Sequence, residues 1–284
     1  MVAQVEDGVV RALATAVEEA DGVAAFSEQT LLNLGGTPDR DVHHLPVLDE
    51  HGALLGYAQL DGTSAELAVH PGHRRRGLGA RLLDEVLALS PSAQIWAHGP
   101  HPGAAPLAAG RGLTVVRELW LMTSPPPTAA SVPTIPSDVV ITTFDTDRDA
   151  EDWLAVNARA FAEHPEQGRI SRADLEARLA EPWFDARGFW LARSAVDGAL
   201  LGSMWTKVSG RTGEIYVLGI DPAAQGRGLG GLLTAVAMQR FAELGERELD
   251  EIDLYVEGDN APAIRTYQKA GFRRRRADVQ YART

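Results

Sequence analysis

The chain has 284 residues, a length that accommodates two domains of ordinary size. Its net charge of −12 argues against nucleic acid or a polyanionic surface as the main partner, because phosphate binding needs a basic face. The absence of cysteine excludes disulfides, thiolate metal sites and a cysteine nucleophile. No signal-peptide pattern opens the chain and no segment reaches membrane-spanning length, so we expect a cytoplasmic protein without a membrane partner.

The N-terminal half alternates helix and strand patterns. Two short helices are expected at residues 9–17 and 26–34, with Ser27 as the cap of the second. A strand-and-loop segment at residues 64–80 leads into a helix that ends near residue 87. Further strands are predicted at residues 45–48, 54–60, 94–97 and 113–122.

A proline-rich segment separates the two halves. Residues 124–137 contain five prolines among small polar residues, a composition that cannot form a helix or a central strand. We therefore expect a semi-extended linker between an N-terminal domain of residues 1–123 and a C-terminal domain of residues 138–284.

The C-terminal half repeats the plan of the first. Helices are predicted at residues 150–161, 172–179 and 261–270, and strands at residues 139–144, 189–192, 200–208, 252–256 and 276–281. Repetition of one α/β unit in a single chain predicts a tandem architecture.

The most informative stretch is residues 214–233. Residues 215–220 form an apolar run typical of a buried strand, Asp221-Pro222 ends it, and a helix begins after the loop QGRGLG at 225–230. Such a loop is also found in tight turns and in Rossmann folds, but the Rossmann glycines directly follow the strand. The form (Q/R)xxGxG after an interrupted strand resembles the acetyl-CoA loop of the GCN5-related N-acetyltransferases (GNAT). The same pattern, RRRGLG, occurs 151 positions earlier.

The two halves differ in their ionisable residues. When the halves are aligned on the proline that precedes each glycine loop, Glu214 lies opposite Thr63, and when Gly271 is set on Gly112, Tyr267 lies opposite Ala108. Acyl transfer to an amine needs a base for the ammonium proton and an acid for the leaving thiolate. We therefore expect the C-terminal half to be catalytic and the N-terminal half to be degenerate.

Plainer interpretations exist for several of these residues. Tyr267 has helical spacing from Ala263 and Ile264, which also suits a core residue, and Glu214 also suits a solvated turn. His98 and His101 have the spacing of metal ligands but lack acidic or thiol companions nearby in the sequence, so we expect no metal site.

Seven segments resemble the mycothiol acetyltransferases, a family of tandem GNAT enzymes, over nearly the whole chain. They are AFSEQ at 25–29, WAHG at 96–99, HPEQG at 164–168, WTKV at 205–208, GEIYV at 213–217, LYVE at 254–257 and DNAPAIRTYQ at 259–268. The resemblance implies two domains, each with a mixed, mostly antiparallel sheet flanked by helices. It also implies acetyl transfer from acetyl-CoA to the cysteinyl amine of a Cys-glucosamine-inositol conjugate, desacetylmycothiol, without a metal.

The resemblance also implies roles for individual residues. Glu214 matches the general base and Tyr267 the general acid. The acetyl-CoA site of the C-terminal half would comprise Leu218, Gly219, Ile220, Gln225, Gly226, Arg227, Gly228, Leu229, Gly230, Gly231, Asn260, Ala261, Pro262, Ala263, Ile264 and Arg265. A second acetyl-CoA site in the N-terminal half would comprise Leu67, Ala68, Val69, Arg75, Arg76, Gly77, Leu78, Gly79 and Ala80. The substrate site would comprise Glu28, Glu166, Lys207, Glu214 and Tyr255.

Two alternatives stay open at this stage. One is a tandem acetyltransferase that acts on another small amine or on a protein N-terminus. The other is a non-catalytic acetyl-CoA sensor, which the degenerate first half suggests and the pair Glu214 and Tyr267 argues against. In each case we expect a monomer without a nucleic-acid partner.

Overall fold

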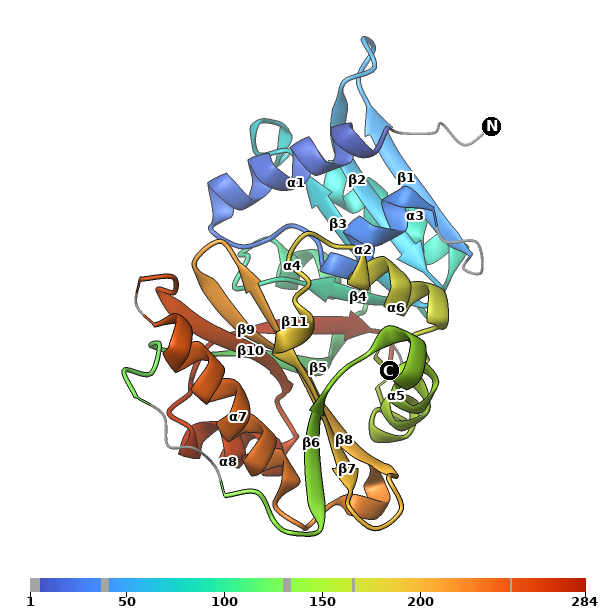
Figure 1. Cartoon of the computed structure of the whole chain (residues 1–284). Coiled ribbons are helices and arrows are strands. Elements are labelled where there is room, and N and C mark those ends of the chain that lie inside the picture. The colour runs from blue at the N-terminus through green and yellow to red at the C-terminus, as the bar shows by residue number, and fades with distance from the viewer. Residues whose placement is uncertain (1–5, 37–40, 130–133, 165–166, 246) are drawn as a thin grey trace. The chain divides into compact units, whose positions relative to one another are not determined.

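The computed structural model describes residues 6–36, 41–129, 134–164, 167–245 and 247–284 (Figure 1). The chain divides into two compact units, and each is described separately. Unit 1 comprises Met1–Leu119 together with Arg276–Thr284, and unit 2 comprises Trp120–Arg275. The chain passes from one unit to the other inside strands β5 and β11, which are Thr114–Ser124 and Arg273–Ala282.

Residues Arg276–Thr284 thus belong to unit 1, whereas the sequence-based prediction places them in the C-terminal domain. Residues 279–281 of β11 pair with strand β4 of unit 1, and Asp278 accepts a hydrogen bond from the backbone N–H of Gly99 at 2.8 Å. Backbone pairing of this kind cannot be recognised from the local sequence, because it joins segments some 180 positions apart.

Unit 1 has four further strands, β1 (Val42–Leu48), β2 (Leu54–Asp61), β3 (Ser64–Val69) and β4 (Gln94–Ala97). The pairs β1–β2 and β2–β3 are antiparallel, β3–β4 is parallel and β4–β11 is antiparallel. Its helices are α1 (Asp7–Asp21), α2 (Glu28–Leu32), α3 (Leu78–Leu89) and α4 (Ala104–Ala109). One core cluster contains α1 with the segment that leads into α2, and another contains α3 and α4, so helices cover both faces of the sheet.

Unit 2 repeats this plan with β6 (Val139–Thr143), β7 (Phe189–Ser194), β8 (Leu200–Ser209), β9 (Thr212–Ile220) and β10 (Glu251–Glu257). The first four strands pair antiparallel in chain order, and β9 pairs with β10 in parallel. Its helices are α5 (Thr146–Ala160), α6 (Arg172–Leu179), α7 (Leu229–Leu244) and α8 (Ala261–Lys269). Helices α5 and α6 pack on one face of this sheet, and α7 and α8 pack on the other.

The sequence predicts most of these elements, and the α/β class with two repeated units is confirmed. Ser27 caps α2 as expected, because its side chain accepts a hydrogen bond from the N–H of Thr30. The short helix α4 is missed, and Glu214, expected just ahead of a strand, lies inside β9. Of the proline-rich segment 124–137, Ser124 is the last residue of β5, and the other described residues, 125–129 and 134–137, form neither helix nor strand.

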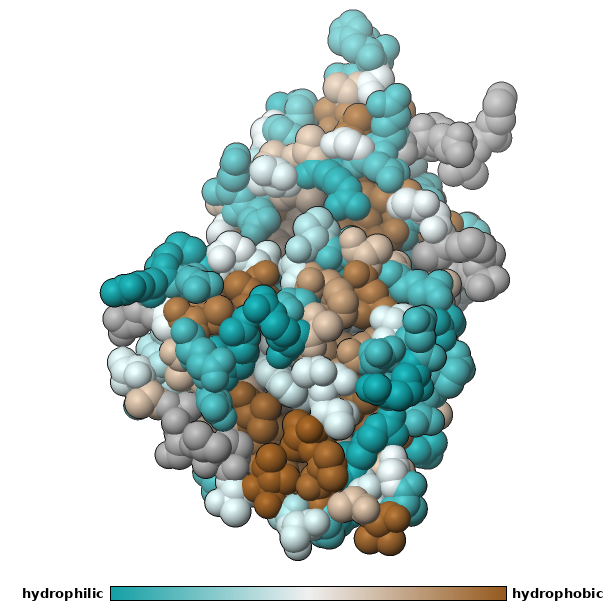
Figure 2. Space-filling model, in the orientation of Figure 1, coloured by the Kyte–Doolittle hydropathy of each residue, from teal (hydrophilic) through white to brown (hydrophobic). Residues whose placement is uncertain are grey.

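Hydrophilic residues cover most of the face drawn in Figure 2, and hydrophobic residues form separate patches on it. Among the residues that the structure describes, no helix combines the length and the apolar character needed to cross a membrane.

Candidate active site

A β-bulge interrupts the alternation of side chains between the two faces of the sheet in strand β9. Trp205 of β8 pairs with Val217 and Thr206 pairs with Ile215, so Tyr216 is the extra residue. Ile215 belongs to the core under α7 and α8, whereas Val217 belongs to the core under α5 and α6. Tyr216 packs against the α5 and α6 core as well, which shows that the bulge turns two successive side chains to one face.

Glu214 lies on the α5 and α6 face of β9. Its neighbour Gly213 faces α7, because a Cβ atom on Gly213 would lie 2.7 Å from the ring of Phe241. Ile215 on the other side also faces α7 and α8. Side chains alternate along a strand, so Glu214 points to the opposite face.

Strands β9 and β10 pair only over their first halves. Their register runs from Thr212 with Glu251 to Ile215 with Leu254, although β9 continues to Ile220 and β10 to Glu257. Beyond this point the backbone of Leu218–Ile220 has an edge that β10 does not pair, beside the glycine loop. An extended ligand with amide groups can bind such an edge by adding to the sheet.

The glycine loop leads directly into α7. Asp221 accepts a hydrogen bond from the N–H of Ala223, and the Arg159 guanidinium lowers the pKa of the Asp221 carboxyl group against the effect of burial. Gly226 and Gly228 both have φ of +78°, which L side chains rarely adopt. The helix ladder begins with the N–H of Leu232, which donates to Gly228. The amides of the first turn precede that ladder and suit an anion such as a pyrophosphate.

The structure gathers many of the predicted acetyl-CoA residues of unit 2 around one core cluster. Leu229 and Ile264 are members of it, and Leu218, Ile220 and Ala263 pack against it. Of the remaining predicted residues of this site, the structure places Gly219 in β9, Gln225, Gly226, Arg227 and Gly228 in the loop, Gly230 and Gly231 in the first turn of α7, and Asn260, Ala261, Pro262 and Arg265 at the start of α8 or within it. Among the polar members, Arg227 pairs with Asp138 at 2.8 Å, and Asn260 caps α8.

Tyr267 belongs to the same cluster from α8. Its side chain is 6% exposed, and its ring lies 6.0 Å from that of Phe272. Burial raises the pKa of the Tyr267 phenol well above its usual value of 10. The hydroxyl therefore stays protonated at neutral pH, as an acid toward a thiolate must.

Glu214 has an ionisable neighbour on each adjacent strand. Lys207 of β8 and Asp253 of β10 are its direct register partners. The flanking residues Ile252 and Leu254 belong to the α7 and α8 core, so Asp253 points to the same face as Glu214. Lys207, Glu214 and Asp253 are thus three ionisable residues at matching positions of three neighbouring strands.

The remaining predicted substrate residues are Tyr255, Glu28 and Glu166. Tyr255 lies in β10 and is 40% exposed. Glu28 is the first residue of α2 in unit 1. Glu166 lies outside the described residues.

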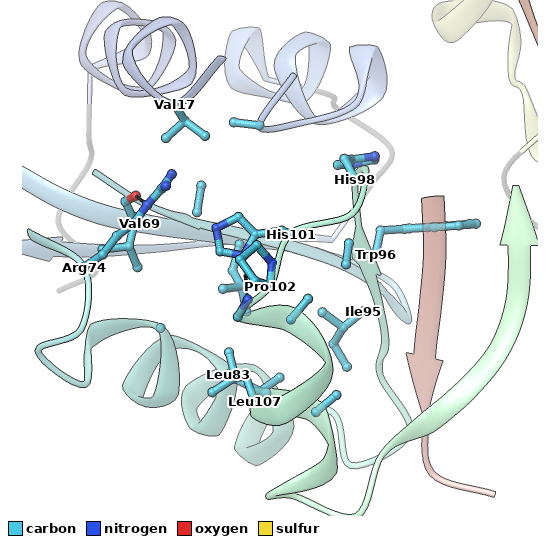
Figure 3. A pocket seen from close by; sticks show the side chains of 18 of the residues that line it. Val17, Val69, Arg74, Leu83, Ile95, Trp96, His98, His101, Pro102 and Leu107 are labelled. Atoms are coloured by element: carbon cyan, nitrogen blue, oxygen red, sulfur yellow. Dashed lines mark hydrogen bonds between the residues drawn. The ribbon is translucent and has the colours of Figure 1, made fainter. Parts of the chain in front are cut away.

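Unit 1 contains a cavity of about 760 Å³ where the sequence predicts its acetyl-CoA site (Figure 3). Eight of the nine predicted residues line it, namely Leu67, Ala68, Val69, Arg75, Gly77, Leu78, Gly79 and Ala80. Arg76 is not among the lining residues. Val17 of α1, Leu83 of α3 and Leu107 of α4 surround the same space in Figure 3, together with His101 and Pro102. Its size and mostly apolar wall are those of a small-molecule site.

His98 lies at the wall of this cavity between two carboxylates. Its Nδ1 is 3.1 Å from Asp278 and its Nε2 is 3.3 Å from Glu66, and both carboxylates are almost fully buried. The two carboxylates outweigh desolvation and raise the pKa of His98 to about 10, while His98 lowers the pKa of both partners against the effect of burial. Glu66 also accepts the backbone N–H of Ser27 at 2.8 Å.

This cluster supplies the acidic companions that the local sequence around His98 lacks. A protonated imidazole has no lone pair to give a metal ion. Within the described part of the chain, no group of three or more His, Asp or Glu side chains is arranged as a metal site.

Sequence reasoning missed the aromatic residues around Lys207. Its Nζ lies 4.7 Å from the ring centre of Trp183 and 5.3 Å from that of Tyr216. Tyr216 lies in the GEIYV segment two residues after Glu214, which is the one signal that marks it. Nothing in the local sequence marks Trp183.

Comparison with known proteins matches these features. The model of the acetyltransferase (GNAT) family matches the chain twice, at residues 12–107 and 152–272. A tandem GNAT protein from the clavulanic acid biosynthesis pathway superimposes with a TM-score of 0.76 at 20% identity, covering 97% of this chain and 94% of its own. A GCN5-related N-acetyltransferase from Sphaerobacter thermophilus gives a TM-score of 0.70 at 21% identity, with 98% and 92% coverage. These two structures support the fold.

Curated relatives are much closer in sequence. The mycothiol acetyltransferase of Sanguibacter keddieii is 48% identical over 96% of this chain and 92% of its own length. That of Catenulispora acidiphila is 46% identical, with 96% and 93% coverage. The predicted GNAT fold and N-acetyltransferase activity are thus confirmed, and the chain belongs to the mycothiol acetyltransferase family.

Proposed function

We propose that this chain transfers the acetyl group of acetyl-CoA to the cysteinyl amine of desacetylmycothiol, giving mycothiol and CoA. The observation that carries the proposal is the placement of a carboxylate and a protonated phenol around one strand. Glu214 projects from the α5 and α6 face of β9, and Tyr267 lies in the core on the α7 and α8 face. The names of the curated relatives support the choice of substrate.

Acetyl-CoA supplies a thioester, and unit 2 offers backbone groups to hold it. The first-turn amides of α7 suit its pyrophosphate, and open space beside Gly226 and Gly228 admits the phosphate oxygens. The unpaired edge of Leu218–Ile220 suits the amides of the pantetheine arm. An N–H on this edge would also polarise the thioester carbonyl.

The two side chains then divide the proton transfers. Glu214 accepts a proton from the substrate ammonium, directly or through a water, and the free amine attacks the thioester carbon. Collapse forms the amide and releases the CoA thiolate. Tyr267 gives its proton to that thiolate, because a phenol is still protonated at neutral pH when the thiolate forms.

Polar residues on the Glu214 face suit the acceptor. Lys207 offers hydrogen-bond donors to the hydroxyl groups of the sugar and inositol, and the carboxylate of Glu214 suits an ammonium. The family resemblance assigns two further carboxylates, those of Glu28 and Glu166, to the acceptor. The phenol of the half-exposed Tyr255 adds a further polar contact.

Unit 1 would bind a second acetyl-CoA without transferring its acetyl group. The cavity lined by residues of β3 and α3 supports the binding. Ala108, which has no ionisable group, stands at the position that corresponds to Tyr267. The monomeric state and the absence of a nucleic-acid partner remain predictions.

The test is CoA release from acetyl-CoA and desacetylmycothiol by the wild type and by Tyr267→Phe. We expect turnover by the wild type and a fall in kcat of about 100-fold or more in the variant. Tyr57→Phe is the matched control, because Tyr57 is a fully buried tyrosine of unit 1 outside both proposed sites.

Each other outcome would change the mechanism, the substrate or the function. Turnover unaffected by Tyr267→Phe would keep the enzyme and remove Tyr267 from the mechanism. Turnover only with aminoglycosides or peptide N-termini would reject desacetylmycothiol as the substrate. Binding of acetyl-CoA without turnover of any amine would favour a sensor.

A further inference from the structure

Two aromatic rings hold the ammonium group of Lys207. Its Nζ lies 4.7 Å from the ring centre of Trp183 and 5.3 Å from that of Tyr216. The two rings are themselves in contact, with centres 5.0 Å apart and an angle of 60° between their planes. An ammonium within about 6 Å of a ring face is attracted by the ring quadrupole. Lys207, with its flexible side chain, is thereby confined to one region.

The rings of this aromatic pair are fixed by buried neighbours. The Arg178 guanidinium donates a hydrogen bond to the Tyr216 hydroxyl at 2.9 Å and another to the backbone oxygen of Asp174 at 3.0 Å. Trp205, which is fully buried, lies behind both rings at 5.2 Å from Tyr216 and 5.7 Å from Trp183. A pair supported in this way moves little when Lys207 changes its contacts.

The location of the pair connects it with the chemistry. Lys207 is the register partner of Glu214, and the bulge at residue 216 turns Tyr216 to the face where Glu214 lies. Bulges near active sites commonly redirect a side chain in this way. The aromatic pair therefore fixes a cation next to the proposed base, on the face assigned to the acceptor.

We propose that Trp183 and Tyr216 are positioning residues that hold the Lys207 ammonium at the acceptor site and thereby set the affinity for the polyhydroxylated part of the acceptor. This inference rests on the proposed function, because it assigns the acceptor to the face of Glu214. The pair acts through Lys207, and acetyl-CoA binds at the glycine loop and at the free edge of β9. Weakening the pair should therefore affect the acceptor and leave acetyl-CoA binding unchanged.

The experiment measures KM for desacetylmycothiol, KM for acetyl-CoA and kcat in three variants. Trp183→Leu removes the ring face and should raise the acceptor KM about 3- to 30-fold, the range of a cation–π contact. The acetyl-CoA KM and kcat should change less than about 2-fold. Trp183→Phe keeps a ring and should restore most of the affinity. Trp120→Leu is the matched control, since the ring centre of Trp120, in the same unit, lies 4.2 Å from the guanidinium carbon of Arg274 in another cation–π pair.

A double-mutant cycle with Lys207→Met separates positioning from a structural role. If Trp183 acts through Lys207, adding Trp183→Leu to Lys207→Met should cause no further rise in the acceptor KM. Fully additive effects on the acceptor KM would overturn the inference, and so would an equal rise of this KM in Trp120→Leu. Turnover by the wild type would leave the proposed function intact in either case. Absence of wild-type turnover with desacetylmycothiol would reject the proposed function and the inference together.

Discussion

The two units share a backbone plan and differ in the groups that it carries. In unit 2 the N–H of Phe272 donates to the carbonyl of Tyr267 at 3.0 Å, and in unit 1 the N–H of Leu113 donates to that of Ala108 at the same distance. Ala108 therefore occupies the place of Tyr267. The backbone hydrogen bond at this position is kept in unit 1, but the tyrosine that could act as the acid is replaced by alanine.

The two units also differ at the position of the proposed base, Glu214. Loop spacing places Glu214 opposite Thr63, but the bulge adds one residue to β9, whereas β3 pairs with β2 without a register shift. In the parallel registers, Ser64 beside Gln94 corresponds to Glu214 beside Asp253. The counterpart in unit 1 is thus Ser64, which is equally unable to act as a base. A pocket can persist after both proton-transfer groups are lost.

Unit 1 instead uses its ionisable groups for structure. Glu66, His98 and Asp278 form a buried cluster that joins β3, the end of β4 and the C-terminal strand. Each carboxylate also accepts a backbone N–H, from Ser27 and from Gly99. Fully partnered carboxylates of this kind stabilise a fold and have little capacity to accept a substrate proton.

The largest contrast is expected between Glu214→Gln and Glu66→Gln. The first removes the proposed base and should lower kcat/KM about 100- to 10,000-fold with little change in melting temperature. The second breaks a buried ion pair and should lower the free energy of unfolding by about 3 kcal/mol with little change in kcat. Steady-state kinetics and thermal denaturation of both variants measure the contrast.

Glu243→Gln, at the exposed end of α7, controls for the loss of a carboxylate in unit 2. A Glu66→Gln variant that folds normally but loses turnover would contradict a purely structural role of the ionisable residues in unit 1. A fully active Glu214→Gln variant would remove the base from the mechanism.

A smaller effect is expected from pH, again confined to unit 1. The pKa of His98 is raised from 6.5 to about 10, so its charge contributes stability that is complete below pH 6.5 and is lost as pH rises through about 10. The melting temperature of the wild type should therefore fall more between pH 7 and pH 10 than that of His98→Asn, which lacks the titrating group. Parallel pH dependence in the two proteins would contradict the assigned charge state.

Local patterns were sufficient to predict most helices and strands, the repeat and the glycine loops. They also selected Tyr267 and Glu214, because comparison of the halves shows which positions carry ionisable groups. They were insufficient for the group around His98 and for the aromatic pair at Lys207. Asp278 lies 180 residues from His98, and Trp183 lies 24 residues before Lys207. Such contacts depend on strand order and helix packing, which leave no local periodicity.

The smallest effect concerns the glycine loops themselves. Arg75 has φ of +62° where the second repeat has Gly226 at +78°, and the left-handed region is unfavourable for a residue with a Cβ atom by about 1–2 kcal/mol. Arg75→Gly should raise the free energy of unfolding by up to about 1 kcal/mol, because the added chain entropy of glycine offsets part of the relief. Gly226→Ala should lower it by about 1 kcal/mol. Gly230→Ala is the control, since Gly230 lies in α7 with open space around it and alanine there should stabilise by about 0.5–1 kcal/mol. Chemical denaturation can resolve these differences, and a destabilised Arg75→Gly variant would show that contacts of the Arg75 side chain outweigh the strain of its backbone.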